Sequence, residues 1–145
     1  AGNSKFQYEK NIPSQMQIDR LQIVNYPHGG GELRDHVDPR KNQRVVSGLI
    51  MSKKGVDFDQ GGFYFRGKNY KKLNIEDRLE IGDSVIFYGS IVHGVEKVDK
   101  NKKLDWKSND GRWFIGMFVN ESNHVKNRIT ASDLSNSTNF KKKAS

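Results

Sequence analysis

The sequence predicts an all-β domain, either a sandwich or a barrel, from two observations. About eight short runs rich in β-branched and aromatic residues follow one another between residues 21 and 120, with Gly and Pro turn signals between them. No long apolar pattern of helical period interrupts these runs. The length of 145 residues fits one domain, 1–145, and leaves no comfortable room for two.

The expected strands lie between a polar lead-in, 1–20, and a polar tail, 121–145. In chain order they are LQIVNY (21–26), ELRDHVD (32–38), VVSGLIM (45–51), FYF (63–65), LNIEDRLEI (73–81), SVIFYGSIV (84–92), VEKV (95–98) and RWFIGMFVN (112–120). VVSGLIM is almost continuously apolar, which is typical of a strand buried on both faces. The polar stretch 99–111 is expected to form an insertion, and the tail a short helix or an extended segment.

Composition predicts a small core and excludes several classes of protein. Hydrophobic residues make up 34% of the chain, with 8 Phe, 2 Trp and 5 Tyr. No stretch approaches the roughly 18 apolar residues of a membrane span, and no targeting segment is visible, so we expect a soluble, cytoplasmic protein with no membrane partner. The absence of cysteine excludes disulfides and thiolate metal ligands. The net charge of +8 comes from scattered basic residues, which indicates a solvated surface, and nucleic acid is not the expected partner.

The triplet His36-Val37-Asp38 is the first part of a candidate metal site. On a strand, alternate residues project from one face, so His36 and Asp38 can converge while Val37 turns away. His93 follows the apolar run 84–92. Two histidines and one carboxylate form the facial triad of non-haem Fe(II) sites, which leaves the other coordination positions open. These residues alone leave open that both histidines are ordinary sheet residues and that Asp38 only forms a turn.

The chain also resembles a known family over residues 21–120. YPHGGGELRDHVDP, VVSGLIM, GGFYF, IEDRLEIGDSVIFYGSIVHGVEKV and GRWFIGMFV, in this order, resemble the core of Fe(II)/2-oxoglutarate-dependent dioxygenases, most closely their prolyl-hydroxylase-like branch. The resemblance implies a double-stranded β-helix, which is a jelly-roll fold of the cupin-like kind, with few or short helices at the termini. It also implies that the whole chain is a single oxygenase domain.

The resemblance assigns roles to five residues. It implies that His36, Asp38 and His93 hold Fe(II). Arg112 opens the last core strand and matches the basic residue that binds the distal carboxylate of the co-substrate 2-oxoglutarate, a task that suits a forked guanidinium. Tyr26 matches a tyrosine whose hydroxyl lies near the co-substrate.

Alternatives remain for the co-substrate residues. Arg66 and Arg44 are rival anchors for 2-oxoglutarate, and Tyr26 is equally compatible with a plain core position. A further tyrosine of the prolyl-hydroxylase branch, on the third strand, is replaced here by one of the residues 49–51, Leu-Ile-Met. This departure puts a prolyl substrate in doubt without affecting the iron site.

The implied function is hydroxylation of a small molecule or a peptidyl side chain with O2 and 2-oxoglutarate, releasing succinate and CO2. The resemblance also allows ascorbate as a reductant. Substrate contacts normally come from loops, here 52–60, 66–72 and 99–111. Two other classes stay open: a catalytically silent β-helix that binds or senses a ligand, and a basic β-barrel that binds nucleic acid or an anionic polymer.

Overall fold

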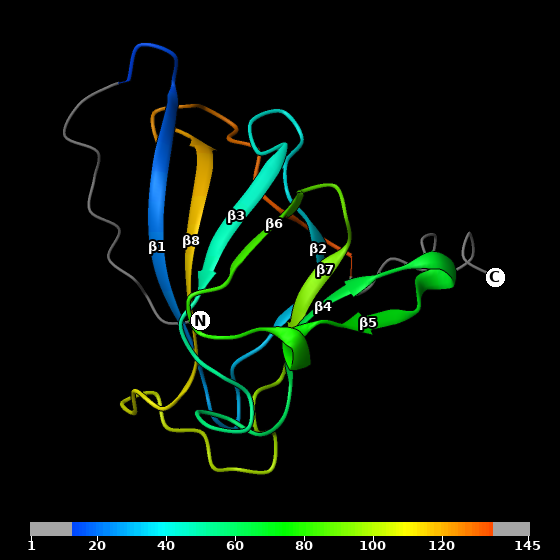
Figure 1. Ribbon diagram of the computed structural model, residues 1–145. Coiled ribbons are helices and arrows are strands. Elements are labelled where there is room, and N and C mark those ends of the chain that lie inside the picture. Colours follow the sequence, from blue (N-terminus) through cyan, green and yellow to red (C-terminus); the bar gives the residue numbers. More distant parts are fainter. Residues whose placement is uncertain (1–12, 135–145) are drawn as a thin grey trace.

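The computed structural model describes residues 13–134 and forms two antiparallel sheets that face each other (Figure 1). The first sheet has the strand order β1-β8-β3-β6, built from Gln17–Pro27, Gly111–Glu121, Val45–Ile50 and Ser84–Tyr88. The second has the order β5-β4-β7-β2-β9, built from Lys72–Asn74, Gly62–Arg66, His93–Glu96, Leu33–Val37 and Ser132–Asp133. The predicted all-β class is therefore confirmed.

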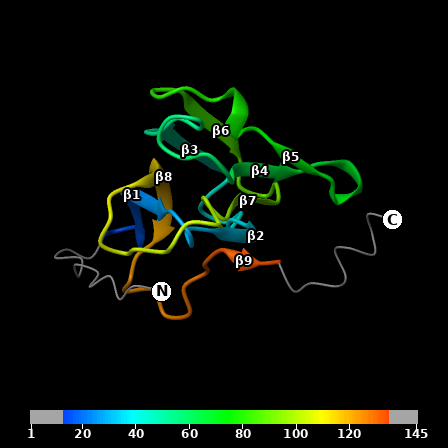
Figure 2. The same cartoon turned by 90° about the horizontal axis from the view of Figure 1, so that it is seen from below.

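The chain alternates between the two sheets as it proceeds. β1 and β3 lie in the first sheet, and β2 and β4 in the second, so consecutive strands mostly cross from one layer to the other. β5 is the exception, because it pairs with β4 in the second sheet. Figure 2 shows these layers along their edges, with β9 beside β2 at the free end of the second sheet. Because β2 and β7 are neighbours, residues far apart in the sequence meet on the inner face of this sheet.

Two expected boundaries at the ends of the core were wrong. β1 begins at Gln17, inside the expected lead-in, because all its residues pair with β8, from Gln17 opposite Glu121 to Pro27 opposite Gly111. The first part of the expected tail adds β9, which pairs with β2. The remainder of the lead-in, 1–12, and of the tail, 135–145, lies outside the described residues.

β3 is buried on one face only, which corrects the expectation drawn from its apolar run. Val46 and Ile50 are almost fully buried, whereas Val45 and Leu49 are exposed on the opposite face. The outer surface of the first sheet is apolar where these side chains project, and Leu21 on β1 is exposed there too. The continuous apolar run of β3 therefore does not mean that the strand is buried on both faces.

The expected strand 73–81 divides into two elements. β5 ends at Asn74, and a 3-10 turn, η2 (Glu76–Arg78), follows it. The extended conformation stops there because Glu76 turns inward: its Oε2 atom accepts a hydrogen bond of 2.5 Å from the N–H of Phe63. This turn carries a carboxylate into the core at a point where the sequence pattern predicted a continuous strand.

The expected strand 84–92 is also shorter than predicted. β6 ends at Tyr88, and Gly89 hydrogen-bonds through its N–H to the Arg44 carbonyl and through its carbonyl to the Asp38 N–H. The next strand, β7, begins at His93 rather than after it. This places His93 inside the ladder, opposite His36.

Helical structure in residues 13–134 is limited to η2 and a second 3-10 turn, η1 (Lys68–Tyr70). Both turns are internal, so the helices expected at the termini are not found in this part of the chain. Neither turn is long enough to cross a bilayer, and the structure contains no candidate membrane-spanning helix within its described range.

The core is small, as predicted, and lies between the sheets. Its buried residues come from both layers, from the loop before β4 and from the segment after β7: Ile50, Phe58, Phe63, Val85, Val95 and Val98. Phe65 packs edge-on against Phe63 and Phe87, with ring centroids 5.0 Å apart, and the tilted rings of Phe63 and Phe87 are 5.5 Å apart. His93 stands at the border of this cluster, 4.7 Å from the Phe87 ring centroid. The aromatic cluster thus forms one wall of the candidate site.

Candidate metal centre and cavity

The structure brings the three predicted metal ligands together. His36 lies on β2, Asp38 directly follows it, and His93 is the first residue of the neighbouring strand β7. All three are buried, and each offers a ligand atom within 4.8 Å of those of the other two. The ring centroids of His36 and His93 are 4.1 Å apart. Two sheet neighbours and one loop residue thereby form a compact set of two nitrogens and one carboxylate.

Backbone carbonyls fix the orientation of both imidazoles. His36 Nδ1 lies 2.9 Å from the Arg34 carbonyl, and His93 Nδ1 lies 2.8 Å from the Ile91 carbonyl. A carbonyl oxygen only accepts, so each Nδ1 carries the proton and each Nε2 keeps a lone pair. Metal-bound histidines are commonly held in this way, with the second ring nitrogen bonded to a carbonyl or carboxylate.

The charge balance of this group favours a cation at its centre. Burial, together with the neighbouring His36, lowers the pKa of His93 to about 4, although its bond to Ile91 acts in the opposite direction. His93 is therefore neutral near pH 7. Its Nε2 atom nevertheless lies 3.4 Å from Asp38 Oδ2, so a lone pair faces a carboxylate oxygen.

Asp38 has an oxygen that the described residues do not satisfy. Oδ2 is buried and has no hydrogen-bond partner among residues 13–134. Burial raises the pKa of Asp38, and the nearby His36 lowers it by less. A buried carboxylate oxygen normally binds a donor or a metal ion. A divalent cation would satisfy Asp38 Oδ2 and both Nε2 lone pairs, so these residues fit a metal centre.

The three ligands lie in the wall of a cavity of about 770 Å³ between the two sheets. The second sheet contributes Phe63 and Val95 beside the histidines, and the first sheet contributes Val46 and Val85 opposite them. A cavity of this size and mostly apolar lining is typical of small-molecule sites.

Two paired glycines give the cavity its depth. Gly48 on β3 lies opposite Gly116 on β8. A Cβ atom on Gly48 would collide with the Phe114 ring, and one on Gly116 would collide with the Phe118 ring. Both rings therefore lie over glycines of the first sheet, and both line the cavity. Without these glycines, the rings would have to move.

Arg112 lines the same cavity, but it already has an acidic partner. It is the second residue of β8, and its side chain is only 2% exposed. Its Nε atom donates a 2.9 Å hydrogen bond to Glu76 Oε2, whose residue is equally buried. Arg112 thus lies where a 2-oxoglutarate anchor was predicted, while Glu76 neutralises it.

Tyr26 lies opposite Arg112 in the β1–β8 ladder and also lines the cavity. The Arg112 guanidinium carbon is 5.7 Å from the Tyr26 ring centroid. Burial raises the pKa of Tyr26, Arg112 lowers it and Glu76 raises it, with a net upward shift. The phenol therefore stays protonated and can donate a hydrogen bond into the cavity.

Gln43 adds a polar group that the sequence pattern did not indicate. It lines the cavity and is 3% exposed. Its Nε2 atom is buried without a hydrogen-bond partner in the described part of the chain. An unsatisfied buried donor beside a cavity is suited to bind an acceptor on a ligand.

The rival anchors Arg66 and Arg44 and the two remaining histidines lie elsewhere. Arg66 binds Asp35 on the outer side of the second sheet, and Arg44 contributes its carbonyl to the Gly89 N–H. His28 lies 2.5 Å from Asp99, and His124 is in an exposed turn. None of these four residues lines the cavity that holds the candidate ligands.

Glu76 and Gln43 were missed for different reasons. Glu76 lies in a run read as a strand, and only the rule that a buried arginine needs a counterion could have suggested an acidic partner. Gln43 lies in a polar loop with no motif around it. No signal in the sequence distinguished it from a solvated glutamine.

A comparison of the chain with protein families, curated proteins and solved structures found no match.

Proposed function

We propose that this protein is a non-haem iron oxygenase that hydroxylates an organic substrate with O2 and 2-oxoglutarate. The observation that carries the proposal is the buried group of His36, Asp38 and His93, with Asp38 Oδ2 unsatisfied within the described residues. Two imidazoles and one carboxylate on one side of a cavity suit Fe(II), because they leave coordination positions for other ligands.

The strand order supports the proposed fold. In a double-stranded β-helix, consecutive strands alternate between two sheets that enclose a cavity, and the strands from β1 to β8 do so here except β4 and β5, which pair within the second sheet. The proposed metal ligands lie on the inner face of the second, five-stranded sheet and face the four-stranded first sheet across the cavity. We therefore infer a jelly-roll oxygenase domain, and we extend the proposal to a cytoplasmic enzyme.

Fe(II), when bound, would supply the chemistry by which O2 and 2-oxoglutarate convert a C–H bond to C–OH with release of succinate and CO2. The chain's own residues would bind and orient the reactants. Arg112 uses Nε for Glu76, and its guanidinium has two further nitrogens with which to bind the distal carboxylate of 2-oxoglutarate. Tyr26 would donate from its protonated phenol to the same carboxylate.

Other residues would shape the pocket. Phe63, Phe87 and Phe114 line the cavity, and the first two contact the His93 ring, so these side chains would keep water away from it. Gln43 Nε2 would bind an acceptor of the substrate or co-substrate. A substrate with an apolar part and one hydrogen-bond acceptor suits this lining, whether it is a small molecule or a peptidyl side chain.

One observation favours a second candidate, a β-helix that binds a metal and a ligand without turnover. Glu76 neutralises Arg112, so the cavity lacks the unpaired cation that would attract a dicarboxylate most strongly. In that case the metal would bind while 2-oxoglutarate would bind weakly or not at all.

The test is succinate release by purified protein with Fe(II), ascorbate and 2-oxoglutarate, with panels of peptides and metabolites as substrates. Metal binding is measured in parallel by anaerobic titration calorimetry. We expect binding of one metal ion and 2-oxoglutarate-dependent succinate formation. A bound metal without succinate formation under any condition would favour the silent module, and failure to bind any metal would overturn both.

A matched pair of histidine variants gives the control. His93→Ala should abolish metal binding and succinate release. His124→Ala removes an exposed histidine outside the site and should change neither. Equal metal binding by these two variants would contradict the assigned ligands.

A further inference from the structure

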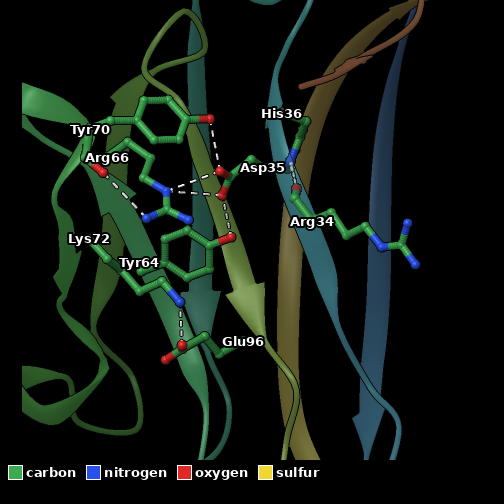
Figure 3. Close-up of polar contacts among 8 residues, drawn as sticks. All are labelled: Arg34, Asp35, His36, Tyr64, Arg66, Tyr70, Lys72 and Glu96. Carbon is green, nitrogen blue, oxygen red and sulfur yellow. Dashed lines mark hydrogen bonds and ion pairs between the residues drawn. The ribbon is translucent and has the colours of Figure 1, made fainter. Parts of the chain in front are cut away.

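Asp35 and His36 are adjacent on β2, and both are buried on opposite sides of the strand. His36 faces the cavity, whereas Asp35 points to the outer side of the sheet, as Figure 3 shows. A residue on the outer face of a sheet is normally exposed to solvent. The burial of Asp35 therefore requires a structural explanation.

The explanation is a cluster of hydrogen bonds that reaches across the sheet. Asp35 Oδ1 accepts 2.6 Å from the Tyr64 hydroxyl, and Oδ2 accepts 2.8 Å from the Tyr70 hydroxyl. Arg66 Nε contacts both oxygens at 3.1 and 3.2 Å. Tyr64 and Arg66 belong to β4, which is not a neighbour of β2, because β7 lies between them. We call Asp35, Tyr64, Arg66 and Tyr70 the outer clamp.

The outer clamp passes over β7 at Gly94. Tyr64 and Gly94 are paired in the β4–β7 ladder. A Cβ atom added to Gly94 would lie 2.5 Å from the Tyr64 hydroxyl oxygen and 2.5 Å from the Leu33 carbonyl. The absence of a side chain at Gly94 thus gives Tyr64 its path to Asp35. Gly94 directly follows the candidate ligand His93.

The backbone at Asp35 is irregular. Leu33 pairs with Val95, and His36 pairs with His93, so β2 contains one more residue than β7 between these pairs. Such a bulge bends a strand and redirects its side chains, and bulges are frequent beside active sites. Arg34 and Asp35 form this bulge. The Arg34 carbonyl within it accepts the Nδ1–H of His36.

We propose that Asp35 is a positioning residue for the metal centre, which holds the β2 bulge in place so that the Arg34 carbonyl orients His36. The path is continuous: the outer clamp holds the Asp35 carboxylate, the adjoining Arg34 carbonyl fixes the imidazole tautomer, and Nε2 then faces Asp38 and His93. Outer partners of metal ligands usually contribute roughly 10- to 100-fold to metal affinity. The inference rests on the proposed function, because it assigns His36 to a metal.

The decisive variant is Asp35→Asn, which keeps the side-chain size and removes the charge. We expect its Co(II) affinity, measured by titration, to fall roughly 10-fold or more, with a changed visible spectrum of the bound ion. Tyr64→Phe, which removes a single hydroxyl, is the replacement variant if Asp35→Asn does not fold. We expect it to lower the Co(II) affinity by a smaller factor. Tyr88→Phe, on the exposed side of β6, is the matched control and should leave affinity and spectrum unchanged.

A second buried carboxylate, Asp99, serves as the control for a merely structural role of Asp35. Asp99 accepts hydrogen bonds from the backbone N–H groups of Asp59 and Gln60, away from the metal ligands. Asp99→Asn should lower stability without altering the Co(II) spectrum. If Asp35→Asn leaves affinity and spectrum at the wild-type values, or changes them no more than Asp99→Asn does, the positioning role of Asp35 is wrong.

A measurement without metal separates this inference from the proposed function. The ¹⁵N shifts of the His36 ring report its tautomer, which the Arg34 carbonyl should hold in the Nδ1–H form in the wild type. We expect a mixed population in Asp35→Asn. If the wild type binds no Co(II) or Fe(II), the proposed function fails, and an unchanged His36 tautomer in Asp35→Asn overturns the positioning role by itself.

Discussion

Arg112 and Glu76 form an ion pair of 2.9 Å in which neither side chain is more than 2% exposed. The pair joins β8 to η2, and Glu76 also accepts the Phe63 N–H. It fixes the direction of the guanidinium at the cavity wall. It also reduces the positive charge available to a ligand. Both consequences can be measured.

Removing one partner of this pair should strongly destabilise the protein. Glu76→Gln leaves a buried guanidinium without a counter-charge, and such a change costs about 3–5 kcal/mol of unfolding free energy. Urea denaturation measures the loss. The exposed pair of Lys53 and Glu80 is the control, since Glu80→Gln should cost no more than about 1 kcal/mol. Equal losses in both variants would contradict a buried, interacting pair.

Glu76→Gln should also change the response to 2-oxoglutarate. In the wild type, the co-substrate carboxylate meets a neutral pair, whereas in the variant it meets an unpaired buried cation. With Mn(II) present, 2-oxoglutarate should raise the Tm of Glu76→Gln by more than that of the wild type. Asp77→Asn, at an exposed neighbour in η2, should respond like the wild type. An equal shift in all three proteins would exclude Arg112 as the anchor.

The metal-free protein should lose stability as the pH falls from about 6.5. Burial holds the pKa of His93 at about 4 in the folded state, below its ordinary value of 6.5, so the unfolded state binds more protons in this window. The contribution of His93 between pH 7 and pH 5 is roughly 2 kcal/mol. The raised pKa of Asp38 acts in the opposite direction at the acidic end.

Urea midpoints at pH 7 and pH 5, with a chelator present, measure this dependence. His93→Gln should show a flatter profile than the wild type, because glutamine does not titrate. A His124→Gln control keeps the wild-type slope. An equally steep profile in His93→Gln would show that another group causes it.

Gly116→Ala should narrow the cavity without affecting the metal. The new methyl group would collide with the Phe118 ring, and the near contacts are all to side-chain atoms, so the ring can move. We expect several-fold weaker ligand binding and unchanged Co(II) affinity. The double variant with Phe118→Leu should recover binding. No change in ligand affinity would mean that Phe118 does not border the occupied part of the cavity.

Gln43→Met should weaken ligand binding without lowering the stability of the protein. The substitution removes a buried amide nitrogen that lacks a partner in the described residues and keeps a similar volume, so the metal-free protein should unfold at an equal or higher urea concentration. Ligand binding should weaken roughly 10-fold, because one hydrogen bond to the ligand is lost. Unchanged ligand affinity would contradict a binding role for Gln43.

Much of the architecture was predictable because local patterns determine it. Short β-rich runs between turn residues identified most strands, and the i, i+2 alternation on β2 correctly indicated that His36 and Asp38 converge. The sequence pattern gave wrong expectations where the direction or the exposure of single side chains decides the structure. Glu76 ends β5 by turning inward, and one face of β3 stays exposed although its sequence is apolar throughout.

The sequence by itself determined the all-β class, the small core and three side chains that could hold a metal, because these depend on residue type and on spacing along the chain. Only the tertiary structure decided that Glu76 neutralises Arg112 and that Asp35 reaches β4 over Gly94. Both contacts join residues on elements that are not adjacent in the chain or in the sheet. The order of the strands brings these residues together, and for Asp35 the single-residue bulge of β2 contributes as well. No local periodicity encodes either, since pairing between distant strands depends on the packing of the whole sheet.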